Sequence, residues 1–202
     1  LHETIYNLSM AKLHFFYSTM NAGKSTLLLQ ANHNYIENDH KTLLFIPEET
    51  ALKSDGNIVS RIGLKAKATV ANKNFNYFDY VNKHRSDDLS CILVDEAQFL
   101  SKKQVRELGK IADELNYPVM CYGIRTDFQG ELFEGSSELL AVSDNLIELK
   151  TICAFCNRKA TMVVRTDDKN NIITEGNKVE IGGNEIYKSV CRKHFRELTG
   201  LI

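Results

Sequence analysis

The chain has 202 residues, and 25 Lys and Arg residues against 26 Asp and Glu residues give it a formal charge of −1. Its content of 43% hydrophobic and 25% charged residues excludes a disordered or collagen-like chain. We expect no transmembrane segment and no secretory signal, since the sequence has no long apolar run. The near-neutral charge argues against a general nucleic-acid binder. This length fits one full domain with a small appendage.

In chain order, residues 1–9 are interpreted as an unpatterned leader, with Met10 as the natural start. Short apolar runs predict buried strands at residues 13–17, 43–46, 91–94, 119–122 and 146–149. Helical spacing predicts helices from residue 24 into the high thirties, over 75–84 and over 102–115. Residues 48–63 are polar and predict a long loop. This alternation predicts an α/β fold in which helices cover both faces of a parallel sheet.

The pattern changes after Lys150, where polar turns and short β-like runs replace the alternation of strands and helices. We therefore expect two domains, an α/β domain over residues 10–150 and a smaller module over residues 151–202.

The first chemical motif is the segment 18–25, which matches the phosphate-binding pattern GxxxxGK[ST] except for its initial Ser. Its members are Ser18, Thr19, Met20, Asn21, Ala22, Gly23, Lys24 and Ser25. Backbone N–H groups of such a turn bind phosphate, and Gly23 lets the chain pass close to it. Lys24 would contact the β- and γ-phosphates, and Ser25 would ligate Mg²⁺. A chance GKS tripeptide is the alternative, but the preceding strand and following helix favour a P-loop NTPase-like nucleotide site.

Two adjacent acids, Asp95 and Glu96, follow the apolar run 91–94. An acid at the carboxyl end of such a strand typically holds Mg²⁺ beside the phosphate loop, which is the role expected for Asp95. Glu96 is then available as a base, because a metal-bound carboxylate accepts protons poorly. The alternative is that the pair only ends a surface strand. Together with the phosphate loop, the pair predicts phosphoryl transfer.

The chain has five cysteines, an odd number that favours a reducing cytoplasm over a disulfide framework. Two chelating pairs, Cys153 with Cys156 and Cys191 with His194, predict a closed tetrahedral Zn²⁺ site with a structural role. Such a site would clamp the ends of the intervening segment into a lasso. A redox pair or buried thiols are the alternatives. The remaining Cys91 and Cys121 lie in apolar runs and are expected to be core residues.

These motifs, in this order and at these separations, resemble the type II thymidine kinases of the zinc-containing cytosolic kind, and the bacterial branch in particular. The likeness runs from about residue 11 to residue 195. It is carried by FFYSTMNAGKS (15–25), SRIGL (60–64), LVDEAQFL (93–100), YGIRTDFQGELF (122–133), LKTIC (149–153) and IGGNEIYKSVCRKH (181–194).

The resemblance implies transfer of the ATP γ-phosphate to the 5′-hydroxyl of thymidine, and of deoxyuridine, with Mg²⁺ accompanying ATP. It implies Glu96 as the proton acceptor and Gln98 as a neighbour in the same loop. The positions that match the family's base pocket are Met20, Phe99, Phe128, Phe133, Lys178, Val179, Glu180, Ile181, Gly182 and Tyr187. For the aromatic residues among them, core packing is the alternative. Arg61 and Arg165 are candidate transition-state cations by position.

The resemblance also implies a homotetramer and feedback inhibition by dTTP. From the cysteine count, the charge and the lack of a long apolar run we expect a cytoplasmic location with no nucleic-acid or membrane partner. One departure is the segment Glu49-Thr50-Ala51-Leu52, where family members often carry an Asp-x-Arg-like pattern.

Two other classes of protein remain open. One is a P-loop ATPase acting on nucleic acid, disfavoured by the charge of −1 and a lasso that is not basic. The other is a nucleotide-binding adaptor without catalysis.

Overall fold

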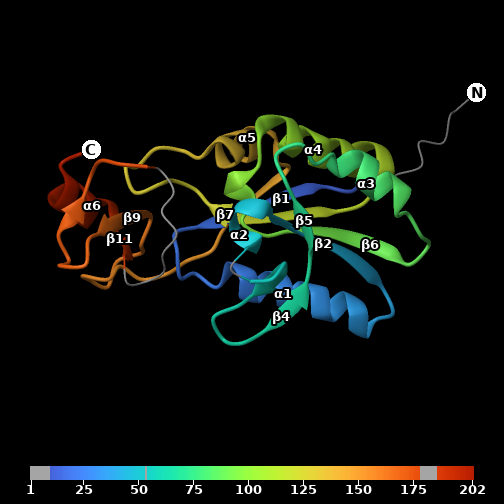
Figure 1. Ribbon diagram of the computed structural model, residues 1–202, viewed down its shortest axis with the longest axis horizontal. Helices are drawn as coiled ribbons and strands as arrows, with labels where there is room; N and C mark the ends of the chain where they lie inside the picture. The colour runs from blue at the N-terminus through green and yellow to red at the C-terminus, as the bar shows by residue number, and fades with distance from the viewer. Residues whose placement is uncertain (1–9, 53, 178–185) are drawn as a thin grey trace, which may run out of the picture.

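The computed structural model of the protein describes residues 10–52, 54–177 and 186–202. Its centre is a six-stranded sheet in the order β5-β2-β6-β7-β1-β8, in which every pairing is parallel (Figure 1). The strands are β1 (Leu13–Ser18), β2 (Lys41–Pro47), β5 (Thr69–Ala71), β6 (Leu89–Val94), β7 (Val119–Ile124) and β8 (Asn145–Glu148). The predicted α/β fold with a parallel sheet is therefore confirmed, with β5 as an additional edge strand.

Helices cover both faces of this sheet (Figure 1). One face carries α1 (Lys24–Glu37), and the other carries α3 (Tyr77–Lys83), α4 (Lys102–Leu115) and α5 (Glu134–Val142). Along β6, Ile92 and Val94 pack in the cluster on the α3–α5 side, whereas Cys91 and Leu93 pack in the cluster on the α1 side. All four are fully buried, which explains why the strand is a continuous apolar run. Cys121 is equally buried, so both cysteines expected in the core are there.

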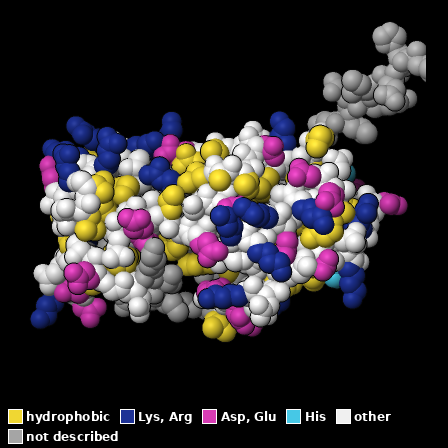
Figure 2. Space-filling view, turned by 90° about the horizontal axis from the view of Figure 1, so that it is seen from above, with side chains coloured by type: hydrophobic (Ala, Val, Ile, Leu, Met, Phe, Trp, Pro, Cys, Tyr) yellow, Lys and Arg dark blue, Asp and Glu magenta, His cyan; other side chains and the backbone are white. Residues whose placement is uncertain are grey.

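Helix α4 begins at a capping box, in which the Ser101 hydroxyl accepts from the Gln104 backbone N–H while the Gln104 side chain accepts from the Ser101 N–H. Its buried face includes Val105, Leu108 and Ile111, as the helical spacing predicts. Its outer face carries both signs of charge, interspersed over this side of the molecule (Figure 2).

The prediction of a long loop over residues 48–63 is wrong. The segment instead contains α2 (Glu48–Ala51) and β3 (Asn57–Val59), which pairs antiparallel with β4 (Lys65–Lys67). Ile58 is fully buried in the cluster on the α1 side. A three-residue strand with one buried apolar side chain is too short to show the alternation on which strand prediction depends.

Helix α5 was also absent from the prediction, because its second and third residues, Gly135 and Ser136, are weaker helix formers. Tertiary packing explains it. A Cβ on Gly135 would lie 2.4 Å from the Ala97 carbonyl oxygen and 2.8 Å from that of Leu100. The bare glycine therefore lets α5 press against the turn that follows β6, which contains the short helix η1 (Ala97–Phe99).

A second, antiparallel sheet forms at one end of the molecule, in the order β10-β9-β11 (Figure 1). It consists of β9 (Met162–Thr166), β10 (Ile172–Ile173) and β11 (Tyr187–Val190), and α6 (Arg192–Thr199) follows it. Its small core contains two of the predicted metal ligands, Cys153 and Cys191, together with Val164, Val190 and Phe195. None of the helices in the described ranges combines the length and apolar character needed to cross a bilayer.

Candidate active site

The phosphate loop lies between β1 and α1, the context that its motif requires. Two of its residues have left-handed backbone conformations, Asn21 with φ 64° and Gly23 with φ 76°. A Cβ on Gly23 would meet no protein atom within 4 Å, so what the protein itself demands there is the positive φ. The expected close approach of the chain to phosphate at Gly23 stays a prediction.

Lys24 opens α1 and its ammonium turns back over the loop. It donates hydrogen bonds to the Ser18 hydroxyl at 3.0 Å and to the Thr19 carbonyl at 2.7 Å. Ser18, which replaces the usual first glycine, thus supplies an acceptor for the lysine. Burial lowers the pKa of Lys24, opposed by the carboxylates of Glu96 and Asp95.

Asp95 follows β6 and lies under the loop with 3% of its surface exposed. Burial raises the pKa of Asp95, with repulsion from Glu96 adding to the effect and a hydrogen bond from Ser25 opposing it. Its Oδ1 atom is buried, with no hydrogen-bond partner among the described residues. A buried orphan carboxylate oxygen beside a hydroxyl and a phosphate loop is a donor set that fits Mg²⁺.

Glu96 is held differently from its neighbour. Its φ of 50° is left-handed, a conformation that is uncommon for a residue other than glycine. The Gln98 Nε2 atom donates to Glu96 Oε2 at 2.5 Å, and Gln98 Oε1 accepts the backbone N–H of Ile124 at 3.0 Å. Gln98 is 2% exposed, so a buried amide fixed to β7 orients the Glu96 carboxylate.

A cavity of about 510 Å³ extends from the phosphate loop past Glu96 to a group of aromatic side chains. Of the predicted site residues, those that line it are Met20, Asn21, Ala22, Gly23, Lys24, Ser25, Glu96, Gln98, Phe99, Phe128, Phe133 and Tyr187. Phe99 and Phe133 meet edge to face, with ring centroids 5.8 Å apart. Ser18, Thr19 and Asp95 are buried and do not line this cavity. Residues 178–182 lie outside the described residues.

The cavity also has lining residues that the sequence reasoning missed: Thr26, Glu49, Thr50, Val59, Ser60, Ile62, Ile124, Thr126, Asp127 and Val163. Asp127 belongs to the stretch 122–133, in which the resemblance implies only Phe128 and Phe133 as pocket residues. The same stretch also contains the signal for Asp127. Its Oδ1 accepts the backbone N–H groups of Gln129 and Glu131 and so shapes the turn that carries Phe128.

The two arginines proposed as cations have separate positions. Arg61 lines the cavity and its charge lowers the pKa of Lys24, after burial as the main cause. Arg165 is buried and stands 3.9 Å over the Phe128 ring, outside the cavity lining. Its guanidinium donates to the carbonyls of Glu175 and Asn177. In this position Arg165 supports the aromatic wall and the segment before residue 178, and its expected role as a transition-state cation stays a prediction.

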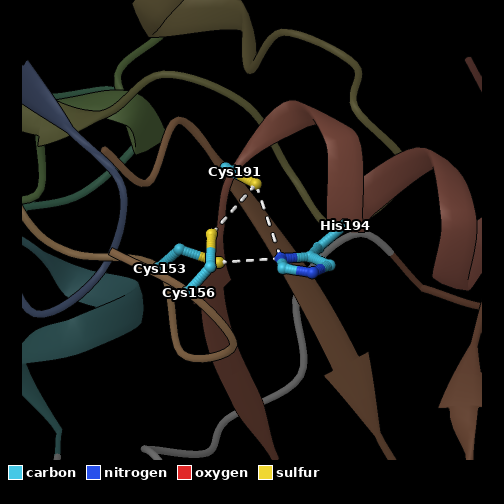
Figure 3. Close-up of side chains that lie close together, drawn as sticks. All are labelled: Cys153, Cys156, Cys191 and His194. Atoms are coloured by element: carbon cyan, nitrogen blue, oxygen red, sulfur yellow. Dashed lines mark hydrogen bonds between the residues drawn. The ribbon is translucent and has the colours of Figure 1, made fainter. Parts of the chain in front are cut away.

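The four predicted metal ligands converge at the base of the second sheet (Figure 3). Their ligand atoms all lie within 4.8 Å of one another. His194 Nδ1 is 3.3 Å from the Cys153 sulfur and 3.5 Å from the Cys191 sulfur, which is 3.9 Å from that of Cys156. Three sulfur atoms and one imidazole nitrogen gathered this closely are a ligand set that fits Zn²⁺. Although burial raises it, the pKa of Cys153 is lowered to about 6 by hydrogen bonds from backbone N–H groups, which favours the thiolate that a metal needs.

Comparison with known proteins identifies the family. A family model described as "Thymidine kinase" matches residues 11–195. A protein of Haemophilus influenzae named "Thymidine kinase" is 52% identical over 194 residues, which cover 96% of this chain and 100% of that protein. Proteins of the same name are 53% identical in Shewanella oneidensis, over 93% of this chain and 98% of theirs, and 52% identical in Escherichia coli O157:H7, over 93% and 92%. The chain therefore belongs to the thymidine kinase family and is an enzyme, a nucleoside kinase.

Proposed function

We propose that the protein transfers the γ-phosphate of ATP to the 5′-hydroxyl of thymidine, and of deoxyuridine, and yields the nucleoside monophosphate and ADP. The observation that carries this proposal is the continuity of one cavity, in which the phosphate loop, Glu96 and an aromatic pocket follow one another. If ATP binds at the phosphate loop and the nucleoside base binds among the aromatic side chains, the 5′-hydroxyl of the nucleoside lies between them, next to the Glu96 carboxylate.

The loop 18–25 is proposed to bind the ATP phosphates through its backbone N–H groups, and Lys24 to bind the β- and γ-phosphates. In the structure this ammonium is already held beside the loop by the Ser18 hydroxyl and the Thr19 carbonyl. Ser25 and Asp95 are proposed to hold Mg²⁺, which neutralises charge that develops on the phosphate oxygens.

Glu96 is proposed as the general base. It accepts the proton of the 5′-hydroxyl as that oxygen bonds to the γ-phosphorus and the bond from phosphorus to the β–γ bridging oxygen breaks, which releases ADP. Gln98 supports this role, because its amide donates to one carboxylate oxygen and leaves the other for the substrate. Asp95, buried below, is unsuited to the task because it is proposed to face the metal.

The nucleoside pocket is proposed to be lined by Met20, Phe99, Phe128, Phe133 and Tyr187, and to be closed by residues 178–182, which lie outside the described residues. An apolar pocket of this kind suits the flat base and its 5-methyl group. Because a missing methyl group weakens binding only modestly, the same pocket would accept deoxyuridine.

The four-residue metal cluster is proposed to hold a structural Zn²⁺, since three thiolates and one imidazole leave no open position for chemistry. We further propose a nucleotide-binding domain over residues 10–150 and a zinc lasso domain over 151–202. A homotetramer and inhibition by dTTP are proposals that rest on the family alone, and a cytoplasmic location is proposed from the cysteine count.

The test is incubation of the protein with ATP, Mg²⁺ and a panel of nucleosides, followed by separation of the products. We expect monophosphate from thymidine and deoxyuridine and little from purine nucleosides. The same samples with single-stranded DNA in place of nucleoside test the ATPase alternative. Hydrolysis of ATP that requires DNA and not thymidine would contradict the proposal.

A further inference from the structure

The phosphate loop turns its backbone N–H groups toward the nucleotide, so some of its carbonyls need donors from elsewhere in the protein. The Met20 carbonyl has two. The Thr19 hydroxyl donates to it at 3.2 Å, and the Ser189 hydroxyl donates at 2.7 Å. Ser189 is 169 residues away in sequence and belongs to β11, in the second sheet. The shorter of the two bonds thus comes from outside the α/β sheet.

Ser189 is also tied to the metal cluster. Its own carbonyl accepts the backbone N–H of Ala154 at 2.9 Å, and Ala154 lies between the ligands Cys153 and Cys156. A third ligand, Cys191, stands two residues further along the chain. Ser189 is buried, with 6% of its surface exposed. Its carbonyl therefore contacts the turn that carries Cys153 and Cys156, and its hydroxyl contacts the phosphate loop.

We propose that Ser189 is a positioning residue, which holds the phosphate loop in its ATP-binding shape and makes that shape depend on the metal cluster. The inference rests on the proposed role of the loop in binding ATP. Ser189 acts through Met20 and does not need to touch the nucleotide.

The backbone of the loop explains why such support matters. Asn21 and Gly23 both have left-handed conformations, so a single turn contains two residues outside the ordinary regions of backbone space. A loop that is fixed before ATP arrives loses less conformational freedom on binding. A second bond from the module reaches the same loop, from the Thr151 hydroxyl to the Asn21 carbonyl, but it is exposed and 3.4 Å long, near the limit of a hydrogen bond.

The main experiment compares Ser189→Thr with Ser189→Val, since the two side chains have nearly the same shape and differ by the hydroxyl. We measure the Kd of ATP with Mg²⁺ by calorimetry, the KM for ATP and for thymidine, kcat and Tm. The Val variant is expected to raise the Kd and KM for ATP about 3- to 10-fold relative to the Thr variant, the effect of one lost hydrogen bond. The KM for thymidine should change less than twofold.

Thr151→Val is the matched control, because it removes a hydroxyl from the longer, exposed bond, and it should leave the Kd of ATP unchanged. Equal Kd values for the Ser189 Thr and Val variants would overturn the positioning role, as would equal loss of affinity for ATP and thymidine. Lys24→Met tests the underlying assumption separately. If it leaves the Kd of ATP unchanged, the loop is not the ATP site and the proposed function fails.

The link to the metal is tested by removing the metal with a chelator, which is confirmed by metal analysis, and measuring the Kd of ATP again. Metal removal should weaken ATP binding in the wild type and in Ser189→Thr. In Ser189→Val it should have a smaller effect, because the connecting bond is already absent. The same fold-change in both variants would overturn the dependence of the loop on the metal.

Discussion

The six-stranded and the three-stranded sheets of this protein differ in how much apolar surface they bury. The six-stranded sheet has an apolar cluster on each face, built from many fully buried side chains such as Phe15, Phe45 and Leu93. The three-stranded sheet has a core of six buried residues, two of which, Cys153 and Cys191, belong to the metal cluster. A sheet of this size buries little apolar surface, so we expect a metal bound at the cluster to supply much of the free energy that holds this part of the chain together.

The two sheets also supply different parts of the candidate active site. The α/β sheet supplies the phosphate loop, Asp95 and Glu96, which all lie next to its fully buried strands. The second module supplies Tyr187 and Val163 to the cavity lining and Ser189 to the loop. We therefore propose that the chemistry takes place on the α/β sheet, and that closure over the nucleoside involves the part of the chain whose cluster is proposed to bind a metal.

The largest effect should come from breaking the metal cluster. Cys153→Ser removes a ligand, and we expect loss of the bound metal, loss of protection from hydrogen exchange over residues 151–202, and loss of activity. Residues 10–150 should stay protected. Cys121→Ser is an informative control, because it changes a thiol buried in the large core and should leave the metal content unchanged. Retention of stoichiometric metal by Cys153→Ser would contradict the ligand assignment.

A smaller effect tests the packing that supports the catalytic turn. In Gly135→Ala the new Cβ would lie 2.4 Å from the Ala97 carbonyl oxygen, so α5 or the turn must shift. We expect a loss of about 1–3 kcal/mol in the free energy of unfolding, measured with denaturant. Gly109→Ala in α4 is the matched control. Its Cβ would meet only Leu13 at 3.9 Å, and the better helix propensity of Ala should stabilise the protein by up to about 1 kcal/mol. Equal effects of the two substitutions would contradict the close packing.

A further expected effect is a pH dependence of the free energy of unfolding, caused by Asp95. Its pKa is raised in the folded state, chiefly by burial, so the folded protein binds this proton more tightly than the unfolded chain. The stabilisation is complete below the unfolded pKa near 4 and is lost as the pH rises through the raised folded pKa. Without Mg²⁺, the free energy of unfolding should fall over this range, and Asp95→Asn should reduce the fall. A slope unchanged in Asp95→Asn would show that other groups cause it.

The features that could be predicted from the sequence are those whose residues lie close together along the chain. The phosphate loop, the acids that follow β6 and the two chelating pairs each occupy a few adjacent positions, and each was found. Their chemistry imposes a spacing, because phosphate needs consecutive N–H groups and a metal needs ligands one turn apart.

The remaining features depend on contacts between distant segments. Gln98 orients Glu96 only because its other end binds Ile124 on β7, and Ser189 reaches Met20 across 169 positions. The burial of Arg165 against Phe128, and of Gly135 against the turn after β6, likewise follows from packing. Short elements such as α2, β3 and β5 were missed because tertiary contacts, not local pattern, stabilise them.

The central claim is that Glu96 is the base, and the most direct test is Glu96→Gln with thymidine binding and the single-turnover rate measured on the same preparation. The amide keeps the size of the side chain and an oxygen that can accept from Gln98. We predict an unchanged Kd for thymidine and a rate lower by a factor of about 10²–10⁴. A rate equal to that of the wild type would contradict the account.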